Sequence, residues 1–98
     1  MYARLSRFAG LAPERIDQTL REFEAGQLPQ IEQMDGFKGV VVGLDRGEGK
    51  AVAITFWETP ETLRASDKLA DQAREVAMAT GQPEREPIVD RYEVVIQR

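Results

Sequence analysis

The sequence lacks two residue types on which much enzyme chemistry depends. Its 98 residues include no cysteine and no histidine. Without cysteine there is no disulfide framework, no thiolate nucleophile and no zinc or iron–sulfur site built on sulfur. Without histidine there is no Ser-His catalytic pair, no usual zinc or non-haem iron site and no axial histidine for haem. We therefore expect no metal and no cofactor.

Long apolar runs and clusters of positive charge are also missing. Residues 1–12 are interrupted by Arg4, Arg7 and Gly10, so this stretch lacks the apolar run of a signal peptide. No other stretch is long and apolar enough to cross a membrane. The 13 basic residues are scattered and the formal net charge is −4, which disfavours binding to phosphates. These features predict a cytoplasmic protein with no membrane and no nucleic-acid partner.

The composition is that of one folded domain. Hydrophobic residues make up 42% of the chain and charged residues 31%, which is ordinary for a globular protein. There is no internal repeat or low-complexity segment, so residues 1–98 are predicted to form a single domain. A chain of this length buries only about 60–65% of its unfolded surface, and a partner that adds burial would stabilise it.

Hydrophobic spacing and end signals predict the order strand, helix, strand, strand, helix, strand. Pro13 and Gly26 delimit the first helix, while Thr59 and Pro60 open the second. Residues 27–35 fit either a turn of helix or a packed loop. Strands are predicted at residues 2–9, 37–45, 51–57 and 87–96. This is the ferredoxin-like α+β pattern, an antiparallel four-stranded sheet with two helices on one face.

The glycine-rich stretch 45–50 predicts a hairpin between the second and third strands. A three-residue loop, Gly47 to Gly49, would pair Arg46 with Lys50. The pairs that follow from this register are Leu44 with Val52, Val42 with Ile54, Val40 with Phe56, and Gly39 with Trp57.

Two helices cover only one face of such a sheet, and the other face is predicted to be apolar. In the register above it holds Val41, Ala53, Thr55, Trp57 and Val95. A large exposed apolar patch is unusual on a monomer. We therefore expect a second copy of the sheet to cover it, which predicts a two-fold homodimer.

Several features together resemble the antibiotic-biosynthesis-monooxygenase-like family. They are Gly36 and Phe37 at the start of a strand, the hairpin, and residues 54–59 (Ile-Thr-Phe-Trp-Glu-Thr) leading into a helix with Leu63. The resemblance implies a dimeric α/β barrel, in which two sheets pack face to face. Some members of this superfamily are cofactor-free oxygenases of polyaromatic compounds, and others degrade haem or have no assigned reaction. The histidine on the second helix of the haem-degrading members has no counterpart here.

Three side chains are candidates for a ligand pocket, each with a structural alternative. Trp57 can stack on a planar ligand or fill the dimer interface over Gly39. Arg4, on a central strand, can anchor an acidic or phenolate ligand or form a structural ion pair. Tyr92 can donate a proton or simply belong to the core. The resemblance assigns none of them a catalytic role.

Two functions remain open at this point. The chain can be a monooxygenase-like dimer that binds a small aromatic or lipophilic molecule and oxidises it without a cofactor. Alternatively it is a non-catalytic dimeric binding or assembly module of the same fold. Asp67, Asp71 and Glu75 lie four residues apart along the second helix, but nearby arginine and lysine residues favour a solvated charged face over a metal site. An enclosed pocket in each subunit, lined by Trp57 and a buried polar group, would favour the first function, and a filled core the second.

Overall fold

The elements of the computed structural model, which describes residues 1–98, follow the predicted order. They are β1 (Tyr2–Phe8), the 3₁₀ turn η1 (Pro13–Arg15), α1 (Ile16–Ala25), α2 (Gln27–Glu32), β2 (Phe37–Asp45), β3 (Lys50–Trp57), α3 (Pro60–Ala65), α4 (Asp67–Gly81) and β4 (Ile88–Glu93). Residues 27–35 therefore contain a short helix. The helix predicted to begin at Thr59 is divided into α3 and α4.

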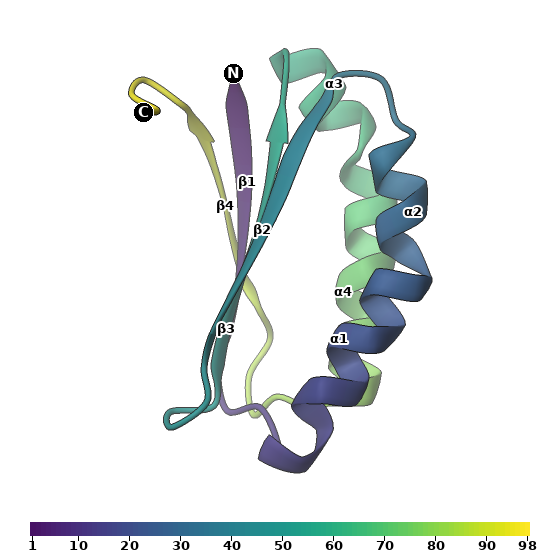
Figure 1. Ribbon diagram of the computed structural model, residues 1–98, viewed down its shortest axis with the longest axis vertical. Coiled ribbons are helices and arrows are strands. Elements are labelled where there is room, and N and C mark those ends of the chain that lie inside the picture. The colour runs from purple at the N-terminus through teal and green to yellow at the C-terminus, as the bar shows by residue number, and fades with distance from the viewer.

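The strands form one antiparallel sheet in the order β2-β3-β1-β4, so β1 and β3 are central. All of the helices lie on one side of this sheet, and the other side is bare (Figure 1). The chain thus has the predicted ferredoxin-like α+β fold. None of its helices is both long and apolar enough to cross a bilayer.

The predicted register of the β2–β3 hairpin is wrong by one residue. Asp45, not Arg46, pairs with Lys50, so the loop has four residues instead of three. The Asp45 Oδ1 atom accepts a hydrogen bond from the backbone N–H of Glu48 at 3.1 Å. Gly49 closes the loop with a φ of +65°, a conformation that glycine adopts without strain. The aspartate side chain and this glycine therefore favour the longer loop.

The slip of one residue reverses the two faces of β3. The residues predicted for the bare face point instead toward the helices, and the intervening residues take the bare face. Those that face the helices are Ala53, Thr55 and Trp57, and those on the bare face are Ile54 and Phe56. The prediction that the bare face is apolar holds, and Val41 lies on it as predicted, but β3 contributes different residues.

Trp57 does not lie opposite Gly39 as predicted. A β-bulge between Phe37 and Gly39 brings Phe37 opposite Trp57 and Gly39 opposite Phe56. The Phe37 and Trp57 rings meet edge to face, with their centroids 5.7 Å apart. The indole therefore lies inside the chain's own core and not at the interface position predicted for it.

The start of α3 and the break after it are both set by hydroxyl side chains. Thr59 and Thr62 form a reciprocal capping box, with each hydroxyl accepting the other residue's backbone N–H at 3.1 Å. The chain turns again at Ser66, whose hydroxyl donates to the carbonyl of Leu63 at 2.6 Å. Such a bond competes with the helical pattern. The break exposes the Ser66 hydroxyl and the Leu63 carbonyl to β1, where Arg4 donates hydrogen bonds to both.

The tight core of the subunit is small. It consists of Ile31, Trp57 and Leu63, with partly buried apolar side chains around it. Only 11 of 98 residues are buried, because one face of the sheet is bare and a cavity separates part of the other face from the helices. The low burial of the isolated subunit agrees with the expectation that a partner adds buried surface.

Candidate functional site

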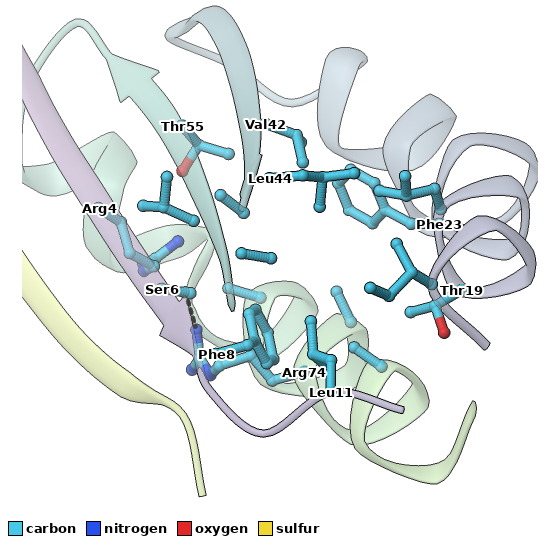
Figure 2. Close-up of a pocket in the computed structure, with 18 of the residues that line it drawn as sticks. Arg4, Ser6, Phe8, Leu11, Thr19, Phe23, Val42, Leu44, Thr55 and Arg74 are labelled. Atoms are coloured by element: carbon cyan, nitrogen blue, oxygen red, sulfur yellow. Dashed lines mark hydrogen bonds between the residues drawn. The ribbon is translucent and has the colours of Figure 1, made fainter. Parts of the chain in front are cut away.

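A cavity of about 100 Å³ lies between the sheet and the helices. Its walls come from β1, β2 and β3 on one side and from α1 and α4 on the other (Figure 2). Of its 19 lining residues 14 are hydrophobic, and none is acidic. The cavity is thus suited to an apolar molecule.

The apolar wall is built where the edge strand β2 faces α1. Val42 and Leu44 lie across from Phe23 and Thr19 of α1 in Figure 2. Val42 is 39% exposed although it lines the cavity, so this edge-strand side chain contacts both solvent and the cavity.

The polar wall is built from the central strands and α4. Arg4 and Ser6 of β1, Thr55 of β3 and Arg74 of α4 lie at this side of the cavity (Figure 2). Residues two apart on a strand share a face, and Arg4 is the cross-strand neighbour of Thr55. The sheet geometry therefore gathers these polar groups at one end.

Arg4 is buried and tightly held. Its Nη1 donates to Ser66 Oγ at 2.8 Å, and its Nη2 donates to the carbonyl of Leu63 at 2.8 Å. Nη2 also forms an ion pair with Asp67. These partners all lie at the break between α3 and α4, so the break and the arginine fix each other. The structural ion pair considered for Arg4 is present.

Burial and charge act in opposite directions on this ion pair. Burial lowers the pKa of Arg4, and the carboxylate of Asp67 partly offsets that effect. For Asp67, burial acts to raise the pKa, but the hydrogen bond from Arg91 and the charge of Arg4 outweigh it and hold the pKa below its ordinary value. Asp67 is thus ionised at neutral pH, and so is Arg4.

Arg74 approaches the same end of the cavity from α4. It pairs with Asp71 one turn before it, and its Nη1 donates to Ser6 Oγ at 3.4 Å. The Arg74 side chain is only 14% exposed, although the sequence places it on the solvent side of the helix. Asp67 and Asp71 are therefore engaged by arginines, in keeping with the predicted charged face.

Trp57 lies in the core with Ile31 and Leu63 and does not line the cavity. It is 0% exposed, and its Nε1–H donates to Thr55 Oγ1 at 3.0 Å. The structure thus matches neither the stacking on a ligand nor the interface position considered for it. Its contribution to the cavity is indirect, because it orients the threonine hydroxyl on the polar wall.

Tyr92 lies on the bare face of the sheet, remote from the cavity. It pairs with Ala3 across β1 and β4 and is 54% exposed. The expectation of a core tyrosine is therefore wrong for the isolated subunit. Of the three candidate residues, the structure brings only Arg4 to the cavity.

Sequence reasoning missed Ser6, Thr55 and Arg74. Alternation along β1 is enough to place Ser6 beside Arg4, so that signal was available. Thr55 was assigned to the wrong face by the hairpin register. Arg74 lies four residues after Ala70 and three before Ala77, so helical spacing was enough to place it at the border of the apolar side.

Comparisons with known proteins agree with this fold. No protein-family model matches the chain. A monooxygenase of Streptomyces coelicolor, solved in complex with the ligand nanaomycin D, superimposes with a TM-score of 0.78 at 15% identity, over 99% of this chain and 91% of that one. A putative antibiotic biosynthesis monooxygenase of Deinococcus radiodurans gives 0.73 at 16% identity, over 100% and 96%. The fold is thus that of antibiotic-biosynthesis-monooxygenase-like proteins, which confirms the resemblance at this level.

Two further comparisons bear on assembly and on chain length. A dimeric ferredoxin-like protein from an uncultured marine organism gives a TM-score of 0.73 at 8% identity, over 99% of this chain and 90% of that one. An uncharacterised protein of Mycobacterium tuberculosis is 41% identical over 39 residues. That match spans 40% of this chain and 16% of the length of the curated relative.

Proposed function

We propose that this protein is a homodimer that binds a small aromatic or lipophilic molecule in the cavity between sheet and helices. The observation that carries the proposal is the cavity itself, with its largely hydrophobic lining. A folded chain normally fills its interior, because each unfilled volume costs stability. An unfilled apolar cavity is therefore the usual sign of a ligand site.

The ligand proposal is tested by thermal unfolding with a panel of flavins, haem and aromatic phenols. A molecule that binds only the folded state raises the melting temperature, by an amount that grows with its concentration relative to Kd. Ala73→Leu places a larger side chain in the cavity and is expected to abolish the shift. Ala79→Leu is the matched control, because Ala79 is exposed on the same helix and does not line the cavity. An equal shift in both variants would place the ligand elsewhere.

The homodimer is supported by the bare face of the sheet. Ile54 and Phe56 lie on it, together with Val41 and Tyr92, which are 53% and 54% exposed. Apolar residues gathered on one face favour association with the same face of a second copy. The dimeric structural neighbour supports this arrangement.

Sedimentation at micromolar concentration is expected to give twice the 11.0 kDa mass of one chain. Val41→Lys puts a charge into the proposed interface and is expected to shift the protein toward monomer. Gln72→Lys, on the exposed side of α4, adds the same charge and should leave the dimer intact. A wild-type protein that sediments only as an 11.0 kDa species would refute the dimer.

Oxidation of the bound molecule by dioxygen is the second candidate function. It is favoured by one observation, the extensive superposition on a monooxygenase solved with a ligand. Dioxygen would supply one oxygen atom to the substrate, and the other would leave as water with electrons drawn from the substrate. Oxygen-electrode traces with each molecule that raises the melting temperature separate the candidates: uptake indicates an oxygenase, and none indicates a binding module.

A further inference from the structure

We infer that the molecule bound in this cavity carries an anionic oxygen, as a carboxylate or a phenolate, at the end formed by Arg4, Ser6, Thr55 and Arg74. The inference rests on the proposed function and specifies its ligand class. It predicts an amphipathic ligand, with an apolar body toward Phe23 and Leu44 and a negative group toward the arginines (Figure 2).

Hydrogen-bond donors at this end exceed the acceptors available to them. Arg4 is 3% exposed and lines the cavity, yet its buried Nε–H has no partner in the protein. Thr55 Oγ1 accepts from Trp57 and Ser6 Oγ accepts from Arg74, while neither hydroxyl donates to a protein acceptor. A buried donor without a partner is unfavourable, and a ligand oxygen with several lone pairs would satisfy it.

The charges at this end are arranged with the positive groups inward. The Arg4 and Arg74 side chains are 3% and 14% exposed, whereas their partners Asp67 and Asp71 are 37% and 62% exposed. Asp67 is also shared with Arg91, so three guanidinium groups meet two carboxylates. With no acidic residue in the lining, the cavity side of this cluster favours negative charge.

The apolar lining decides which kind of anion fits. A small inorganic anion would leave the hydrophobic walls at Phe23 and Leu44 without contacts and would remain better solvated in water. An organic anion with a single ring places its charge at the donors and its apolar surface against those walls. Charge-assisted bonds of this kind are the strong ones in a low-dielectric site.

Titration with 4-nitrophenol tests the inference, because its absorption spectrum reports its ionisation. If the cavity stabilises the phenolate, the bound dye is expected to ionise at lower pH than the free dye. Arg74→Met and Ser6→Ala should each weaken binding by about tenfold or less and move the bound dye's ionisation back toward the free value. Arg64→Met removes an exposed arginine outside the cavity and should change neither quantity.

Two further probes distinguish the possible failures. Benzoate tests a carboxylate, and uncharged nitrobenzene tests an apolar ring without an anionic oxygen. Binding of nitrobenzene as tightly as 4-nitrophenol, or binding of the dye as neutral phenol, would overturn the anion inference while leaving the apolar cavity as a ligand site. Binding of none of the three would overturn the inference and count against the proposed function as well. Binding of the anions that is unchanged in Arg74→Met and Ser6→Ala would also overturn it.

Discussion

Replacing Trp57 with alanine is expected to lower the free energy of unfolding by about 3–5 kcal/mol. The indole is fully buried, packs with Ile31 and Leu63, and meets Phe37 edge to face. Removing it leaves a cavity that the small core cannot close. Total stabilities of domains are about 5–15 kcal/mol, so the loss is a large share. Urea unfolding followed by far-ultraviolet circular dichroism measures it without relying on tryptophan fluorescence.

Trp57→Phe separates the packing of the ring from its hydrogen bond. Phenylalanine keeps an aromatic ring against Phe37 but cannot donate to Thr55. We expect a loss of about 1–2 kcal/mol, well below that of the alanine variant. The freed threonine hydroxyl should also alter ligand affinity, since Thr55 lines the cavity. An alanine variant that loses less than about 1 kcal/mol would contradict the core position of the indole.

The order of elements was predictable because its signals are local. Proline and hydroxyl residues at helix starts act through the backbone of the same turn, as the capping box of Thr59 and Thr62 demonstrates. Glycine at the end of α1 likewise acts on its own helix. Such signals do not depend on tertiary contacts. The ferredoxin-like order of elements could therefore be predicted without knowing how the helices pack on the sheet.

The faces of the sheet were not predictable in the same way. Both strands of the hairpin carry apolar residues at consecutive positions, so hydrophobic alternation does not select one register. The choice depends on the hydrogen bond from Glu48 to Asp45 and on the conformation of Gly49. One extra loop residue then places Thr55 at the cavity instead of on the bare face, and Trp57 in the core instead of at the predicted interface.

The candidate site was predictable at Arg4 and, by alternation along β1, at Ser6. A charge on a central strand needs a partner or a cavity, and the structure provides Asp67 as the partner and the cavity beside it. The break of the long helix at Ser66 carries no such signal, because serine is common on exposed helical positions. It becomes intelligible only when Arg4 is seen to bind Ser66 and the Leu63 carbonyl.

Replacing Arg4 with methionine is expected to lower the free energy of unfolding by about 2–3 kcal/mol. Methionine has a similar length but leaves Ser66, the Leu63 carbonyl and Asp67 without their buried donor. The loss falls short of that for a fully buried pair, because Asp67 is 37% exposed and keeps Arg91. Urea unfolding at neutral pH gives the difference, and the melting of α3 and the start of α4 should precede the rest in hydrogen exchange.

Arg91→Met is the matched control for Arg4→Met, because both arginines bind Asp67 but Arg91 is 47% exposed. An exposed pair contributes little, so this variant should lose less than about 1 kcal/mol. Arg4→Lys keeps the positive charge, but an ammonium group cannot bind all three partners as the forked guanidinium does. Its free energy of unfolding should therefore lie closer to that of Arg4→Met than to that of the wild type. If Arg4→Met proved no less stable than Arg91→Met, the guanidinium would not be structural. Stability would then not explain why a charged residue lies on a central strand. Binding of a ligand's carboxylate or phenolate by Arg4 would explain it instead.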